Sequence, residues 1–481
     1  MIDDRCTEEE AVRFTSELIR IDTTNRGGGD GCERLAAEYI AARLADVGLD
    51  PMVLESASGR TNVVARFESG QNDKDAVLLH GHLDVVPADA SAWAHSPLSG
   101  EVRDGVVYGR GAVDMKSADA VVLAVVRELK RLGRRPAQDI ILAFTADEED
   151  TGQYGAGWLV QHHADLFDGC KVGIGESGGF TVHARPGFHV YPIACAERGV
   201  RWIRVTAHGK SGHGAKPNDS NAITLLSQAV ARVGSFRWPV RLCPTVRATL
   251  SSLERAITEG ELKPDSPRED EWVEKLLPAL GEAGMLAEGS IRNSCNPTAI
   301  LGGEKVNVIP DVARGLLDGR VVPGGEQEFE QTIAELLGSQ VEWEYVNSEE
   351  ATESDFGSAI VTSMAKALQA EDPGAHILPY CLAGGTDAKH FARLGIAGYG
   401  FTPLYLPASY RYYDMFHGVD ERVPISAIGF GVRVLRRLLL NPMDHGTGLS
   451  RQGNAALPGA LPRCPRGLMA RADLRCGCSW P

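Results

Sequence analysis

Histidine and carboxylate side chains follow apolar segments of this chain, in positions where they could hold a metal ion. In "LLHGHLDVV", His82 and Asp84 come after an apolar run, and in "FTADEED" Glu148 and Glu149 follow another. Residues i and i+2 of an extended chain share a face, so the Asp84 carboxylate could orient the His82 imidazole, as partners of ligand histidines do. A lone acidic run is more often a solvated turn, so a metal interpretation depends on further ligands elsewhere in the chain.

Three further residues of ligand type occupy similar positions. Asp114 ends "VVYGRGAVD", Glu176 ends "VGIGE", and His417 lies far downstream in "DMFHGVDER". If the apolar segments are parallel strands, their carboxyl ends meet at one edge of the sheet, where ligands bind in open α/β folds. Imidazole nitrogen and carboxylate oxygen are both zinc ligands. The sequence therefore predicts a metal site at this edge.

The set is large enough for two zinc ions, for which cobalt or manganese could substitute. Two ions about 3.5–4 Å apart need a bridging ligand, and we expect Asp114 to be that bridge. The predicted ligands are His82, Asp114 and Glu176 for one ion, and Asp114, Glu149 and His417 for the other. Glu148 would then be free to act as general acid and base, although a glutamate seen alone is more often a helix cap or a charge partner.

The elements that must position these residues alternate between helix and strand. Helical patterns are expected at 7–22, 33–47 and 117–132, and apolar strand-like segments at 62–67, 76–86, 106–115 and 139–146. Such alternation with near-continuous apolar runs predicts an α/β fold, with a mostly parallel sheet and helices on both faces.

The pattern changes after residue 195. "GVRWIRVTAHG" alternates like a half-exposed antiparallel strand, and a helix is expected near 221–233. We therefore predict a first domain in two parts, with a small α+β domain inserted between them. The predicted segments are 1–195 and 347–441 for the first domain, 196–346 for the inserted domain, 251–290 for a polar insertion within it, and 442–481 for a disordered tail.

Composition excludes several classes of partner and location. The net charge of −15 over 481 residues argues against nucleic acid or an anionic membrane as the main partner. The N-terminal "MIDDRCTEEE" has neither the basic nor the apolar region of a signal peptide, and no apolar run is long enough to span a bilayer. The ten cysteines show no zinc-knuckle or disulfide spacing, so we expect a cytoplasmic protein with free thiols.

At the level of motifs, the chain resembles the co-catalytic zinc hydrolases that include carboxypeptidase G, aminoacylase, acetylornithine deacetylase, succinyl-diaminopimelate desuccinylase and carboxypeptidase S-like dipeptidases. The matching motifs are "GHLDVVP", "GRGAVDMK", "ADEE", "GESGG", "GKSGHGAKP", "NVIP", "DGRVVPG", "GGTDA" and "FHGVDE", in the family's order across about residues 10 to 440. The resemblance implies a zinc-bearing α/β domain with an inserted lid, and a homodimer that pairs through the lids.

The resemblance also implies roles for individual residues. The metal ligands are those given above, Asp84 supports a ligand, and Glu148 is the general acid/base. His213, in "GKSGHGAKP", matches a lid histidine that stabilises the oxyanion, in many relatives from the partner subunit.

Three further positions match the substrate pocket of the family. Arg320 matches a lid arginine that grips the substrate carboxylate, although it could instead pair with Asp318 or Asp311. Gly385 and Thr386 match a pocket loop, although Thr386 could instead cap the helix that follows.

The function that follows is hydrolysis of an amide bond next to a free carboxylate, in a dipeptide, a C-terminal peptide bond or an N-acyl amino acid. Two alternatives stay open. The first is a biosynthetic deacylase acting on acetylornithine or succinyl-diaminopimelate, which shares the chemistry and differs in pocket residues. The second is a non-catalytic binding protein on the same fold, which loss of a ligand or of the base would indicate.

Overall fold

The structure, a computed structural model, describes residues 4–71, 76–257 and 269–441. The tail predicted at 442–481 lies outside these residues. Among the helices that are described, none combines the length and the apolarity that a bilayer-spanning segment requires.

Ten strands form one mixed sheet whose central strands are parallel. They are β1 (Met52–Ala57), β2 (Arg60–Phe67), β3 (Ala76–His82), β6 (Ile140–Thr145), β7 (Cys170–Gly175), β8 (Val182–Arg185), β9 (Phe188–Glu197), β16 (Thr352–Glu353), β17 (His376–Leu382) and β18 (Ala397–Gly400). The order is β1-β2-β6-β3-β7-β18-β9-β16, with β8 and β17 also paired to β9. Strands β6, β3, β7 and β18 run parallel to one another, so their carboxyl ends share one edge.

Helices cover both faces of this sheet, as two neighbouring residues of β3 demonstrate. Side chains alternate between faces along a strand. The ring of His80 lies 5.1 Å from that of Phe391 in α11 (Ala388–Ala392). A side chain at Gly81 would collide with Asp119 of α3 (Lys116–Arg131), so α3 covers the other face. The predicted α/β class is confirmed.

The remaining helices of this part pack around those two. Helix α3 contacts α1 (Asp4–Ile19), α2 (Arg34–Ala45) and α12 (Ile425–Leu440), and α12 also contacts α10 (Ala359–Glu371). On the opposite face, α4 (Ala156–His162) contacts α11.

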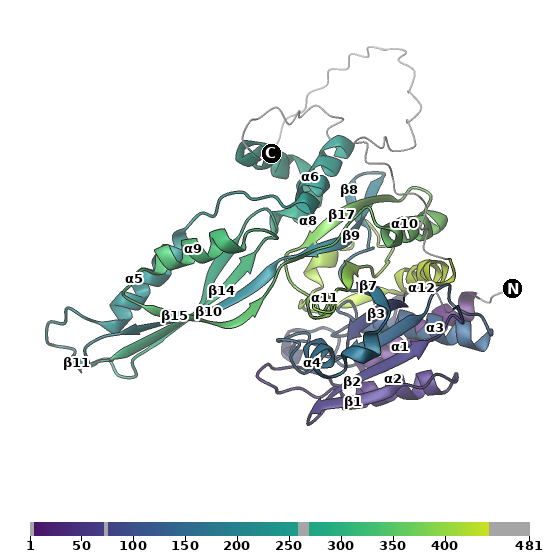
Figure 1. Cartoon of the computed structure of the whole chain (residues 1–481), viewed down its shortest axis with the longest axis horizontal. Helices are drawn as coiled ribbons and strands as arrows, with labels where there is room; N and C mark the ends of the chain where they lie inside the picture. Colours follow the sequence, from purple (N-terminus) through teal and green to yellow (C-terminus); the bar gives the residue numbers. More distant parts are fainter. Residues whose placement is uncertain (1–3, 72–75, 258–268, 442–481) are drawn as a thin grey trace, which may run out of the picture. The chain divides into compact units, whose positions relative to one another are not determined.

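A second sheet has its own core. Strands β12 (Ser294–Gly302), β14 (Val312–Val321), β10 (Gly199–His208) and β15 (Glu342–Glu349) pair antiparallel in that order. Helix α5 (Ala222–Ser235) packs on this sheet and on α9 (Glu326–Leu337) (Figure 1). A hydrophobic cluster that includes Trp238 and Phe329 lies between them. We interpret this α+β unit as the inserted lid and keep 196–346 as its proposed limits.

The segment predicted to lengthen the lid packs elsewhere. It forms α6 (Pro244–Ile257), α7 (Glu269–Leu280) and α8 (Met285–Glu288). Helix α6 lies against β17 of the ten-stranded sheet, and Leu253, Val273 and Leu276 belong to the hydrophobic cluster of that sheet. The described residues of this segment thus pack with the core of the ten-stranded sheet, and their assignment to the lid stays a prediction. Apolar residues three and four apart give an otherwise polar helix one buried face.

The strand predicted over 106–115 is also shorter than expected. It ends at Tyr108, because Gly109 and Gly111 take φ values of 146° and 88°. The resulting β5 (Val106–Tyr108) lies in a small sheet between β19 (Arg422–Pro424) and β4 (Glu101–Arg103). Asp114 therefore follows a glycine-rich turn rather than a strand end.

Candidate metal centre

The five predicted ligands form two groups that share Asp114. His82, Asp114 and Glu176 make one group and Asp114, Glu149 and His417 the other, with the ligand atoms of each group within 4.8 Å of one another. Each Asp114 oxygen faces a different imidazole: His82 Nε2 lies 3.0 Å from Oδ1, and His417 Nε2 lies 3.4 Å from Oδ2. A carboxylate with both oxygens presented in this way is suited to bridge two cations, so the donor set fits a pair of divalent ions.

Strand ends bring most of these residues together. His82 ends β3, Glu148 and Glu149 follow β6 by a few residues, and Glu176 comes directly after β7. The backbone next to them is strained, since Asp147 and Ser177 have φ values of 70° and 71°. Non-glycine residues rarely adopt this left-handed conformation, which concentrates at functional sites.

The turn that carries Asp114 is fixed by a residue that sequence reasoning missed. The buried carboxylate of Glu421 accepts hydrogen bonds from the backbone N–H groups of Gly111 (3.0 Å), Val113 (2.6 Å) and Asp114 (3.0 Å). Glu421 lies four residues after His417, so it ties the loops of two candidate ligands together. Its only sequence signal is its place within "FHGVDE".

Asp84 supports the site differently from the expectation. His82 Nδ1 lies 2.9 Å from the backbone oxygen of Asp84, whereas the carboxylate oxygen Oδ1 is 3.6 Å away. The carboxylate instead accepts hydrogen bonds from the backbone N–H groups of Glu148 (3.2 Å) and Glu149 (3.1 Å), and from Asn25 Nδ2 (2.9 Å). The backbone of Asp84 thus orients the imidazole while its side chain holds the acidic loop.

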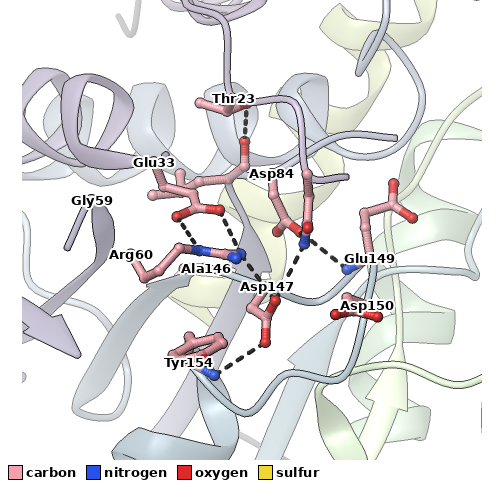
Figure 2. A network of polar contacts seen from close by, with 12 residues as sticks. Thr23, Glu33, Gly59, Arg60, Asp84, Ala146, Asp147, Glu149, Asp150 and Tyr154 are labelled. Carbon is pink, nitrogen blue, oxygen red and sulfur yellow. Dashed lines mark hydrogen bonds and ion pairs between the residues drawn. The ribbon is translucent and has the colours of Figure 1, made fainter. Parts of the chain in front are cut away.

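Asp147, the first acid of the loop that follows β6, belongs to a buried ionic network. Arg60 donates from Nε and Nη2 to the carboxylate of Glu33 at 3.0 and 2.9 Å, and Nη2 also lies 3.0 Å from Asp147 Oδ1. The backbone N–H of Tyr154 donates to the other Asp147 oxygen at 3.1 Å (Figure 2). The Arg60 and Asp147 side chains are 1% and 0% exposed. Asp147 therefore shares with Glu33 the charge of an arginine distant in sequence.

The carboxylates of Glu148, Glu149 and Glu176 lie close together and repel one another. Burial, together with the charges of neighbouring carboxylates, raises the pKa of Glu149 to about 7 and places the pKa values of Glu148 and Glu176 well above their ordinary value. Burial acts in the same direction on Asp114, but hydrogen bonds from His417 and His82 hold its pKa below the usual range. Bound dications would favour the ionised form of all these carboxylates.

Four of the candidate ligands, Asp114, Glu149, Glu176 and His417, line a cavity of about 450 Å³, a size typical of small-molecule sites. Glu148 also lines it, and so do Arg320, Glu349 and Gly385. The apolar part of the wall includes Phe180, Trp202, Tyr380, Leu382, Tyr412 and Phe416. The cavity thus combines an acidic region with aromatic walls and a guanidinium.

Two residues of the cavity wall also bond to neighbouring residues of the chain. Arg320 lines the cavity and also donates from Nε and Nη2 to Asp318 at 2.8 and 3.3 Å. Thr386 lines the cavity, yet its N–H and hydroxyl donate to Glu197 at 2.9 and 2.6 Å, and its Oγ1 accepts from the N–H of Ala388 at 3.2 Å. The Thr386 hydroxyl thus accepts a hydrogen bond from the first residue of α11, although the N-cap position itself is Asp387.

His213 is not brought to the cavity within the chain. It lies in the short strand β11 (Gly212–His213), paired with β13 (Val308–Ile309), and is exposed. Its Nδ1 accepts a hydrogen bond from the backbone N–H of Ala215 at 3.1 Å. The role expected from the resemblance thus needs a second subunit, and it stays a prediction.

Comparison with known proteins decides the family. The sequence profile of Peptidase family M20/M25/M40 matches residues 78–441, which is most of the chain. The chain belongs to this family. As an M20 peptidase it is a hydrolase acting on amide or peptide bonds, and the family is metal-dependent.

Individual relatives extend over almost the whole chain of this M20 peptidase. Aminoacylase-1 of Sus scrofa is 26% identical over 448 residues, which cover 90% of this chain and 95% of the relative. The M20 family metallo-carboxypeptidase Sso-CP2 from Sulfolobus solfataricus superposes with a TM-score of 0.68 at 18% identity, covering 89% of this chain and 98% of that one. The di-peptidase Dug1p from Saccharomyces cerevisiae gives a TM-score of 0.66 at 16% identity, with coverages of 91% and 96%.

Proposed function

We propose that this M20 peptidase hydrolyses the amide bond next to a free carboxylate in an N-acyl amino acid or a short peptide, using two zinc ions. The main support is the position of Asp114, whose two oxygens face different histidines at the wall of the cavity. The cavity also contains a guanidinium, that of Arg320. Similarity to an aminoacylase and to a di-peptidase supports this class of substrate.

The two zinc ions would be held by His82, Asp114 and Glu176, and by Asp114, Glu149 and His417. When bound, they would supply the Lewis acidity that activates water and polarises the amide carbonyl.

Glu148 is the proposed general acid and base. Its carboxylate lies in the cavity next to the candidate ligands, with Oε2 3.9 Å from His82 Nε2. It would accept a proton from the attacking water and deliver it to the nitrogen of the departing amine. The hydrogen bond from its backbone N–H to Asp84 holds this residue in place.

Two lid residues complete the proposal. Arg320 would pair with the carboxylate of the substrate, which suits a planar guanidinium. The imidazole of His213, supplied by the partner subunit of a homodimer, would donate a hydrogen bond to the oxygen that becomes negatively charged.

The test is an activity screen of the purified, zinc-loaded protein on N-acetyl amino acids, dipeptides, acetylornithine and succinyl-diaminopimelate. We expect turnover of several N-acyl amino acids or dipeptides, and loss of that turnover in Glu148→Ala with an unchanged metal content. Turnover of acetylornithine or succinyl-diaminopimelate alone would establish the biosynthetic deacylase instead. Failure to hydrolyse any of them would favour a binding protein.

A further inference from the structure

A second, smaller cavity adjoins the one that the candidate ligands line. Its volume is about 50 Å³, and three side chains line both cavities, those of Met285, Tyr412 and Tyr413. Because these side chains face both spaces, they form the wall between the two cavities. A side chain that can move in this wall decides whether a substrate group in the larger cavity extends into the smaller one.

The two tyrosines of this wall are held by their aromatic neighbours. The ring of Tyr412 stacks on that of Phe180 with the centroids 3.9 Å apart, and Tyr412 is 5% exposed. Tyr413 lies edge-on to both rings, with centroids 5.7 Å from Phe180 and 6.0 Å from Tyr412. Contacts of this geometry are favourable, so both rings are fixed. Met285 is 39% exposed, and its unbranched side chain has three rotatable bonds.

The helix that carries Met285, α8, is anchored on both sides. The next residue, Leu286, is 1% exposed and belongs to the hydrophobic cluster of the ten-stranded sheet. The backbone oxygen of Gly289 accepts a hydrogen bond from Arg198 Nη1 at 2.6 Å, and Arg198 Nη2 donates to the backbone oxygen of Arg320 at 2.8 Å. The backbone at Met285 is therefore fixed beside the strand of Arg320, while its side chain can change rotamer at the cavity wall.

The surroundings of the wall favour an uncharged, apolar group. Phe180 and the aromatic side chains named above line the larger cavity next to it. In the smaller cavity, Val182 and Ala408 continue the apolar surface, and the charged pair Arg411 and Asp414 bond to each other. Glu282 also lines the smaller cavity, so an anionic group is disfavoured there.

We propose that Met285 is a specificity-determining residue that limits the length of the alkyl group that a substrate extends from the larger cavity towards the smaller one. This inference rests on the proposed function, since it concerns the substrate of the same site. The alkyl group belongs to the acyl part of the substrate or to the side chain of its amino acid, and both present the same chemistry to the wall. The methionine side chain closes the smaller cavity, and a shorter residue at position 285 opens it.

The experiment varies the alkyl group from each end of the substrate. One series is N-acetyl-, N-butanoyl- and N-hexanoyl-L-alanine, and the other is the N-acetyl derivatives of L-alanine, L-norvaline and L-norleucine. The value of kcat/KM is measured for each compound with the wild type, Met285→Ala and Met285→Phe. The control is Met52→Ala, which shortens a methionine of β1 that is 42% exposed.

We expect the preference for the longest member over N-acetyl-L-alanine to rise at least about tenfold in Met285→Ala, because each methylene newly buried contributes about fourfold. The response should appear in the series whose alkyl group meets the wall, which identifies the end of the substrate involved. Met285→Phe should lower the same preference, and Met52→Ala should leave it unchanged. The rate with N-acetyl-L-alanine itself should change less than about twofold in Met285→Ala, since its short groups do not reach the wall.

An unchanged preference in both series would overturn the proposal. An equal loss of kcat/KM for every compound would also overturn it, because Met285 would then only hold α8 in place. The opposite shift expected for Met285→Phe keeps the test independent of how well Met285→Ala folds. If the wild type hydrolyses none of these compounds and no dipeptide, the proposed function itself is wrong, and that result is obtained before any variant is made.

Discussion

The two carboxylate oxygens of Asp84 accept hydrogen bonds from neighbouring backbone groups of one loop. Oδ2 accepts from the N–H of Glu149 at 3.1 Å, and Oδ1 accepts from the N–H of Glu148 at 3.2 Å. Asp84 is fully buried and comes two residues after His82. The loop that carries the proposed base and one proposed ligand is thereby fixed to the strand that carries another ligand.

Asp84→Asn should weaken the site without unfolding it. An asparagine side chain has one acceptor oxygen, so one of the two loop N–H groups loses its partner. Changes in groups that support metal ligands typically reduce metal affinity or activity about 10- to 100-fold. Zinc titration of the metal-free variant and kcat/KM of the loaded one measure the effect. Asp89→Asn, at an exposed aspartate that accepts similar hydrogen bonds from Ser91, is the control; equal zinc affinity in the two variants would contradict this role.

Arg60 and Arg66 both lie on β2 and allow a matched comparison of stability. Arg60→Met leaves the buried carboxylates of Glu33 and Asp147 without their cation, and breaking a buried pair typically destabilises by about 3–5 kcal/mol. Arg66 pairs with Asp139 at the surface, so Arg66→Met should lower the free energy of unfolding by less than about 1 kcal/mol. Denaturant unfolding of both variants measures the difference. Similar losses would show that the network in Figure 2 does not stabilise the fold.

Much of the site was predictable because ligand-type residues follow parallel strands. His82, Glu149 and Glu176 come at the ends of β3, β6 and β7, and parallel strands bring such positions to one edge whatever the details of the loops. Asp114 lies beside the other candidate ligands although the strand before it ends six residues earlier. His417 follows no strand end, so the strand-end argument does not account for its place in the site.

The supporting residues were not predictable in the same way. Glu33, Arg60 and Asp147 form one network, but 27 residues separate the first two and 87 the last two. Lone charged residues carry no periodic signal, so only the folded chain shows which of them meet. The packing of α6 on β17 was missed because its polar composition outweighed the helical spacing of its few apolar residues.

His80 should make stability depend on pH. Burial holds the pKa of its imidazole down to about 4, below the ordinary 6.5. Between these values the unfolded chain binds a proton that the folded chain does not, so stability falls as the pH drops from 6.5 to 4, by about 3 kcal/mol from this group. The free energy of unfolding of His80→Leu should therefore fall less over this range than that of the wild type. His162→Leu, at an exposed histidine, is the control; parallel profiles for the wild type and His80→Leu would contradict the assignment.

His213 should act across a dimer interface. Mixing Glu148→Ala with His213→Ala subunits, each nearly inactive alone, should restore about a quarter of the wild-type rate. Half of randomly paired dimers are mixed, and each of these has one complete site. Subunit exchange under mild denaturant followed by an activity assay measures the recovery. No recovery despite confirmed mixed dimers would show that the histidine does not act from the partner subunit.

The most direct test of the whole account is the metal content of active protein, measured by elemental analysis alongside its rate. The shared carboxylate of Asp114 predicts about two zinc, cobalt or manganese ions per chain, loss of turnover on chelation, and recovery when zinc is restored. Fully active protein without a bound transition metal, with turnover unchanged by chelators, would contradict the assignment of these five side chains as ligands of a hydrolytic centre.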